Sequence, residues 1–288
     1  MAAAITVLLD GIASGMLLFV LSVGLSVTLG LMNVVNLAHG AFGMVGGYVC
    51  AVLLNRAGVP FVACLVAATL AAAALGWVLE RLLYVRLYGR DHLDQVLFSI
   101  GLVFVLGACA DYLMGARQQL IQLPDWLSGR VEVAGVGLGR YRIFLILLCG
   151  AVAAALHFGL VRTRFGARLR AAVDDGVVAR GMGLPVGRIF SLTFALGSGL
   201  AGLGGALGVE VLGLDPNFPL KYLVYFLVVV AVGGANSVAG PFVAAILLGV
   251  LDVAGKYWVP QVGAFVIYTA MVVLLLARPE GLLAKARS

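Results

Sequence analysis

Three polar residues, Asn33, Asn36 and His39, interrupt an apolar part of the chain at intervals of three residues. On one helical turn this spacing would place two amides and an imidazole on a common face, where they could form hydrogen bonds with a solute. The same residue types also satisfy free backbone groups at the ends of broken helices. The spacing therefore leaves two interpretations open, a structural cap and a contact with a translocated solute.

The other residues with reactive side chains do not form a catalytic or metal-binding pattern. The three histidines are scattered, and the four cysteines lie in apolar segments without a CxxC spacing. The stretch 197–202 matches GxGxxG, but it lies inside an apolar segment without a preceding strand, so we reject it as a dinucleotide site. No nucleophile, base and orienting group occur together in an extramembrane segment, and no phosphate-binding GxxxxGK[ST] motif is present. We therefore expect no catalytic residue, no metal and no cofactor on this chain. Any ATP that drives its function would be used by partner subunits.

Four acidic residues fall within apolar segments, and they raise the question of a proton relay. Acids inside a membrane are functional candidates by default. All four lie near the end of a predicted span, where water at the interface lowers the free-energy cost of a charge. We therefore favour interfacial placement for Asp10, Asp111, Glu210 and Asp252.

The composition requires a membrane. Hydrophobic residues make up 63% of the 288 residues, charged residues 11%, and the mean hydropathy is +1.12. A soluble domain could not cover its surface with so few charges.

A bilayer core needs roughly 20 apolar residues per helix, and the candidate spans are 5–31, 41–54, 60–79, 95–114, 141–160, 190–211, 222–234, 241–258 and 262–277. We predict an all-α integral membrane protein, one polytopic bundle of eight or nine transmembrane helices over residues 1–288. Within it, Gly204 and Gly208 are spaced for close helix packing.

Two of these segments, 41–54 and 222–234, are too short for an ordinary span. Each adjoins a break, NVVNLAHG at 33–40 and VGGANSVAGP at 232–241. Non-helical backbone is tolerated at membrane depth where protein or a watery cavity satisfies it, and paired breaks in two halves are typical of transporters. The candidate pathway residues are Asn33, Asn36, His39, Gly40, Gly233, Gly234, Asn236 and Ser237.

The basic residues indicate the orientation. If all nine segments cross, 12 of the 19 Lys and Arg lie on one side, including six arginines between Arg162 and Arg188. The positive-inside rule then places this loop and the C-terminus in the cytoplasm. This distribution explains the formal charge of +6, so we expect no nucleic-acid partner. We expect the apolar helices to be surrounded by membrane lipid.

Four motifs, in the same order, resemble the permease subunits of branched-chain amino-acid ATP-binding cassette importers. GLSVTLGLMNVVNLAHGAFGMVGGY, from Gly24, resembles the signature with an N-x-x-N-x-A-H-G core. ERLLYVRL from Glu80 and RTRFGARLRAAVDDGVVARGMGL from Arg162 resemble the inner loops, and VGGANSVAGPFVAA from Val232 resembles the glycine-rich motif. Asn236 and Ala244 stand where the family usually has glycine.

The resemblance implies a bacterial inner-membrane complex. Its other members would be a second permease subunit, expected to be a different chain, two ATP-binding subunits and a periplasmic solute-binding protein. A coupling helix that docks on the ATPase would correspond to residues 171–184, within the coupling region 162–188. Asp174 and Asp175 would lie near the start of this helix, where its dipole favours negative charge, and Ala179 would lie on its docked face. Further residues assigned to this region are Arg168, Arg170, Gly183 and Leu184. The helix should end before Pro185.

The sequence leaves open which solute is carried and whether ATP or an ion gradient drives its transport. Relatives of this appearance carry branched-chain or other amino acids, or urea and short amides. An ion-coupled secondary transporter would also explain paired breaks, but it should place an ionisable group at mid-membrane.

Overall fold

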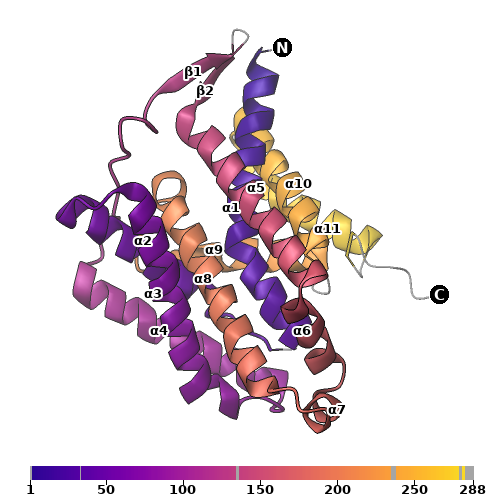
Figure 1. The fold of residues 1–288 in the computed structure, drawn as a ribbon. Coiled ribbons are helices and arrows are strands. Elements are labelled where there is room, and N and C mark those ends of the chain that lie inside the picture. Colours follow the sequence, from indigo (N-terminus) through magenta and orange to yellow (C-terminus); the bar gives the residue numbers. More distant parts are fainter. Residues whose placement is uncertain (1, 33, 134–135, 235–237, 279–280, 283–288) are drawn as a thin grey trace.

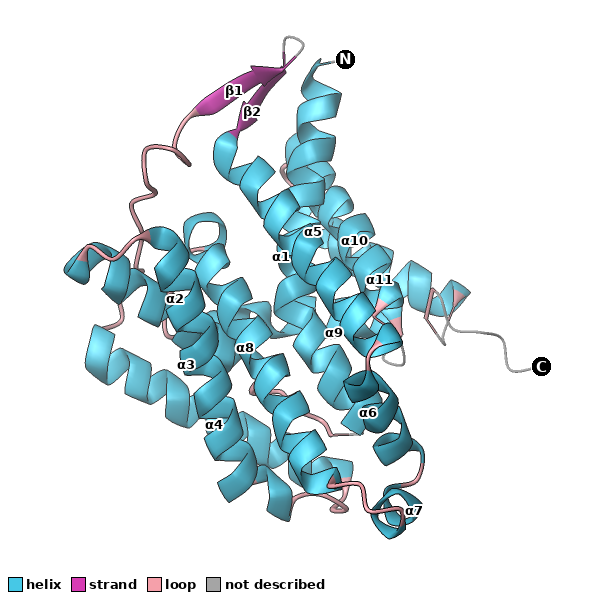
Figure 2. Cartoon of the chain, viewed as in Figure 1, coloured by secondary structure: helices cyan, strands magenta, loops and turns pink. Residues whose placement is uncertain are grey.

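The computed structural model describes residues 2–32, 34–133, 136–234, 238–278 and 281–282. Three of the predicted pathway residues, Asn33, Asn236 and Ser237, lie outside the described residues. Within the described part, helices dominate and the sheet is a single two-stranded hairpin (Figures 1 and 2). This architecture is the all-α membrane fold that the composition predicts.

Seven helices of the described chain are long and apolar enough to cross a membrane. They are α1 (Ala2–Met32), α2 (His39–Ala57), α3 (Phe61–Leu82), α4 (His92–Met114), α5 (Arg140–Arg162), α8 (Val186–Leu212) and α10 (Ala239–Trp258). Two shorter apolar helices are α9 (Phe218–Gly233) and α11 (Gly263–Ala277). All nine predicted apolar segments are therefore helical.

The expectation that segment 41–54 is too short to span is wrong. Helix α2 has 19 residues, because it begins at the polar His39 and continues through Asn55 and Arg56 to a cap at Gly58, where φ is 62°. The predicted segment contained only the apolar residues and left out the polar ends of α2, although the backbone hydrogen bonds of the helix continue through these ends. Helix α9 has 16 residues and is short, as expected.

The remaining elements lie at the two ends of the bundle. The 3-10 helix η1 (Tyr84–Arg86) follows α3, and helices α6 (Arg164–Asp174) and α7 (Gly176–Gly181) lie between α5 and α8. Strands β1 (Arg130–Val133) and β2 (Val136–Gly139) pair antiparallel, with Arg130 opposite Gly139. Figure 1 shows this hairpin at the opposite end of the bundle from α6 and α7. The sequence did not predict the hairpin.

Helix α8 is central, and it packs against α1, α2 and α3. A Cβ atom added at Gly205 would lie 1.8 Å from the Gly43 carbonyl oxygen of α2. One added at Gly204 would lie 2.8 Å from the Leu21 side chain, whereas at Gly208 it would meet only the side chains of Leu212 and Leu17. Close packing is therefore confirmed at Gly204 but not at Gly208, and the tightest approach is at Gly205.

Candidate functional site

The first break leads the chain back into the middle of the bundle. Helix α1 ends at Met32 and α2 begins at His39. The buried His39 imidazole donates from Nε2 to the Leu21 carbonyl over 2.8 Å. Leu21 lies eleven residues before the end of α1, which is roughly 16 Å along the helix axis. The break therefore reaches well inside the bundle, as a broken transporter segment does.

Buried polar side chains from η1 and α4 hold this break in place. Tyr84 Oη donates to Asn36 Oδ1 over 2.7 Å, and the Val35 backbone N–H donates to Gln95 Oε1 over 2.9 Å. Asn36, Tyr84 and Gln95 are each at most 2% exposed. Among the described residues, none is hydrogen-bonded to Asn36 Nδ2. A buried donor without a partner is costly, and the Asn36 amide nitrogen carries two such N–H donors inside the bundle.

Helix α9 lies beside the start of α2. The His39 and Phe226 rings are 6.4 Å apart at 88°, and a Cβ atom at Gly40 would lie 3.0 Å from Pro219 Cα. Gly40 therefore allows α9 to approach the break closely. Since α9 also ends at the second break, this helix connects the two regions.

The second break is formed by close backbone contacts. A Cβ atom at Gly233 would lie 2.3 Å from the Pro241 nitrogen of α10, and Gly234 ends α9 with a φ of 83°. The Leu282 backbone N–H donates to the Val232 carbonyl over 2.8 Å, so Leu282 lies against this break. A side chain at Gly233 would clash with α10, and one at Gly234 would strain the backbone, so both positions favour glycine.

The pathway residues thus fall into two groups. Asn36, His39 and Gly40 contact η1, α1 and α9. Gly233 approaches Pro241 of α10, and Gly234 lies against Gly281. That all of them line one solute route stays a prediction. Tyr84 and Gln95 were missed by the sequence analysis, because neither lies in a break or in a recognisable motif.

The single coupling helix expected over residues 171–184 is wrong. Two helices, α6 and α7, meet at Asp175, whose backbone is extended with φ −151° and ψ 97°. The Asp175 carboxylate accepts hydrogen bonds from the Val177 and Val178 backbone N–H groups, each over 2.9 Å. Asp175 is therefore the N-cap of α7, which suits its predicted position at a positive helix end. Asp174 is instead the last residue of α6.

Ala179 does not lie on an outer face of α7. Its side chain is 3% exposed and packs with Leu169, Ala172, Val186 and Ile189. Three other side chains of this region are exposed, namely Val177 at 74%, Val178 at 57% and Met182 at 78%. We call these three residues the α7 apolar surface.

The other residues assigned to the coupling region surround these two helices. Arg168 and Arg170 are exposed on α6, and the Arg170 guanidinium donates to the Leu160 carbonyl of α5. Helix α7 ends at Gly181, earlier than expected, and Gly183 has a φ of 81°. The Leu184 backbone N–H donates to the Ala179 carbonyl over 3.0 Å. This geometry turns the chain from α7 into α8.

A buried carboxylate lies at the same end of the bundle. Glu80, near the end of α3, is 1% exposed. Its Oε1 accepts from Tyr88 Oη over 2.7 Å, and its Oε2 accepts from Ser191 Oγ of α8 over 2.5 Å. Burial, and then the hydrogen bond to Glu80, raise the pKa of Tyr88, which keeps its hydroxyl protonated as the donor.

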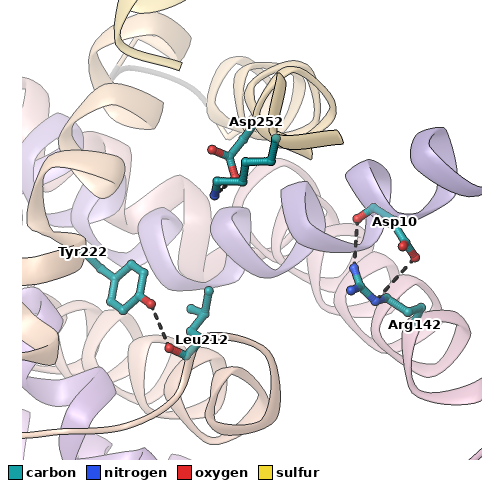
Figure 3. A network of polar contacts seen from close by, with 6 residues as sticks. Asp10, Arg142, Leu212, Tyr222 and Asp252 are labelled. Carbon is teal, nitrogen blue, oxygen red and sulfur yellow. Dashed lines mark hydrogen bonds and ion pairs between the residues drawn. The ribbon is translucent and has the colours of Figure 1, made fainter. Parts of the chain in front are cut away.

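Further polar contacts lie on other parts of the bundle (Figure 3). Arg142 Nε lies 3.4 Å from Asp10 Oδ1, and Tyr222 Oη donates to the Leu212 carbonyl over 2.9 Å. Lys256 Nζ lies 2.6 Å from Asp252 Oδ2, while Asp252 Oδ1 is buried and has no partner in the described part of the chain. Asp252 is thus more buried than its predicted interfacial position implied. Among the described residues, no group of three His, Cys, Asp or Glu could hold a metal ion.

Comparison with known proteins places this architecture in a family. The family model described as "Branched-chain amino acid transport system / permease component" matches residues 7–276. The chain is 25% identical to the high-affinity branched-chain amino acid transport system permease protein BraD of Pseudomonas aeruginosa, over 96% of this chain and 95% of that protein. It is 22% identical to LivH of Escherichia coli, over 96% and 94%, and 27% identical to LivM of the same species, over 94% and 69%.

No solved structure matches the chain. The family model, the relatives matched along nearly the whole chain and the seven helices of membrane length agree with one another. The chain belongs to the family of branched-chain amino acid transport permease components, and it is a multi-pass α-helical membrane protein of that family.

Proposed function

We propose that this chain is one transmembrane subunit of an ATP-binding cassette importer that moves branched-chain or related amino acids into the cytoplasm. Two separate ATP-binding subunits would supply the energy, and a periplasmic solute-binding protein would deliver the solute. The relatives LivH and LivM of Escherichia coli are both named as high-affinity branched-chain amino acid transport system permease proteins. This supports pairing with a second, different permease chain in a bacterial inner membrane.

The α7 apolar surface is the observation that carries the proposal. Val177 and Val178 of α7 and Met182, directly after it, are exposed outside the membrane-length segments, with charged residues on both sides in sequence. Adjacent apolar side chains exposed on an extramembrane surface mark an interaction site for another protein. The same helix is fixed to the transmembrane bundle by the buried Ala179. A partner bound there could transmit a movement to α8.

The proposed orientation places this surface in the cytoplasm, where ATP-binding subunits reside. Arginines are concentrated around α6 and α7, at Arg162, Arg164, Arg168, Arg170, Arg180 and Arg188. The positive-inside rule assigns such a loop to the cytoplasmic side. With nine crossings, the C-terminus would also be cytoplasmic.

A charged substitution in the α7 apolar surface tests the docking role. Val177→Glu and Met182→Glu should leave the chain in the membrane, because both side chains are exposed, but they should strongly reduce co-purification of the ATP-binding subunit. The matched control is Leu120→Glu, since Leu120 is 66% exposed and precedes the hairpin at the opposite end of the bundle. Normal ATPase binding by both α7 variants would refute the docking role.

Uptake by the reconstituted complex tests the solute and the energy source. In proteoliposomes without an ion gradient, ATP inside should drive uptake of labelled leucine, and vanadate should abolish it. Uptake that needs a proton or sodium gradient and no ATP would identify an ion-coupled transporter instead. Uptake of urea with no uptake of leucine, isoleucine or valine would assign the chain to the short-amide importers.

A further inference from the structure

Glu80 joins the end of α3 both to the loop eight residues further along the chain and to α8, 111 residues away. Its carboxylate, buried near the end of α3, accepts from Tyr88 in the loop after η1 and from Ser191 at the start of α8. A carboxylate removed from water requires such hydrogen bonds, because without them burial is strongly unfavourable. The three segments are therefore held together by a contact whose geometry is directional, unlike the apolar packing around it.

On one side, this contact is continuous with α6 and α7. Ala179 of α7 packs against Val186 and Ile189, the first turn of α8. Ser191 follows two residues after Ile189 on the same helix. The ring of Phe190, between them, packs against the Tyr88 ring at 5.8 Å and 89°. A displacement of α7 that moves the start of α8 must therefore also move the donor and the ring that face Glu80 and Tyr88.

On the other side, the contact is continuous with the first break. The loop that carries Tyr88 directly follows η1, and Tyr84 of η1 donates to Asn36. Gln95, which accepts from the Val35 backbone N–H, donates to the Leu87 and Arg90 carbonyls of this loop over 3.3 Å each. The loop is thus hydrogen-bonded both to Glu80 and to the broken segment between α1 and α2.

We propose that Glu80 is a positioning residue that couples the α6–α7 region to the first break. This inference rests on the proposed function, in which a partner moves α7. The Glu80 carboxylate holds Ser191 and Tyr88 in a fixed relation, so that movement of α8 is passed to the loop and from there to Asn36 and Val35. Residues connected through one rigid hydrogen-bonded cluster can transmit a displacement in this way.

The test uses the complete importer complex, reconstituted with its ATP-binding subunits and binding protein. Ser191→Ala, Tyr88→Phe and Glu80→Ala should each leave the complex assembled and its basal ATP hydrolysis unchanged. Stimulation of hydrolysis by loaded binding protein, and uptake, should fall by about fivefold or more, the lower end of typical coupling between sites. In the double variant of Glu80→Ala and Ser191→Ala, the loss should equal that of Glu80→Ala alone, because one contact is removed twice.

Thr193→Val is the matched control. Thr193 is a buried hydroxyl residue two positions from Ser191, and its Oγ1 donates to the Ile189 carbonyl within α8 over 2.8 Å. This control should keep stimulation and uptake. Parental coupling in both Ser191→Ala and Tyr88→Phe would overturn the inference, and so would a loss of uptake that only follows the amount of assembled complex. A parent complex that does not use ATP would instead refute the proposed function.

Discussion

Replacing Gly205 with alanine tests the contact between α8, which follows α7, and α2, which follows the first break. The added Cβ would lie 1.8 Å from the Gly43 carbonyl oxygen and 2.5 Å from the Gly43 carbonyl carbon. Ordinary contact begins near 3.4 Å. The obstacle is backbone rather than a flexible side chain, so α2 and α8 would have to separate by roughly 1.6 Å, the difference between these two distances.

Overpacking of this kind costs about 1–3 kcal/mol and sometimes more, because packed neighbours must move. The gain in helix propensity from glycine to alanine, about 1 kcal/mol, offsets only part of it. We therefore expect Gly205→Ala to lower the apparent Tm of the purified chain in detergent. Since 1 kcal/mol corresponds to about 2–4 °C in a domain of 150–250 residues, a decrease of several degrees is expected.

Gly101→Ala is the matched control, because Gly101 lies within α4 and a Cβ there would meet nothing within 4 Å. Its helix propensity gain has no opposing clash, so this variant should be as stable as the parent or more stable by about 0.5–1 kcal/mol. The two glycine variants should thus shift the Tm in opposite directions. An unchanged or higher Tm for Gly205→Ala would show that α2 and α8 are not in backbone contact.

Two further predictions concern the orientation and the first break. In a variant without the four native cysteines, a cysteine at position 168 should be protected from a membrane-impermeant thiol reagent in intact cells, and one at position 128 should react; labelling at 168 would reverse the proposed orientation. Tyr84→Phe should lower stability by about 1–3 kcal/mol, because the buried Asn36 amide loses its hydrogen-bond donor. Tyr112→Phe, at a tyrosine that is 90% exposed, should leave the Tm unchanged, and equal Tm values for the two variants would contradict the role given to Tyr84.

The transmembrane helices could be predicted from the sequence because their signal is local. Each of the nine apolar segments is bounded by charged, polar or glycine-rich residues, and a bilayer requires the backbone between them to be helical. The predicted helix ends were wrong where a polar residue lies inside a helix. Helix α2 includes His39 because its imidazole is satisfied by the Leu21 carbonyl of α1, a contact that the local pattern does not reveal.

The residues that hold the first break could not be predicted, because they come from distant parts of the chain. Tyr84 is 48 residues from Asn36, and Gln95 is 60 residues from Val35. Glu80 and Ser191 are 111 residues apart. Hydrogen bonds between such residues depend on how the helices pack, and a single sequence carries no periodicity or spacing that indicates them.

The sequence does contain a local signal for the break between α6 and α7, but the family resemblance led us to expect one continuous helix there. Asp175 is followed by glycine, and aspartate is a preferred residue at the N-cap of a helix. In the structure its carboxylate accepts from the backbone N–H groups two and three residues later, so a new helix begins there. The change of direction at this cap decides which side chains face outward. Ala179 turns toward Val186 and Ile189, so the small residue expected to meet a partner instead seats α7 on the bundle. Val177, Val178 and Met182 remain exposed, so these side chains, rather than Ala179, are the apolar ones that a partner of this region would meet.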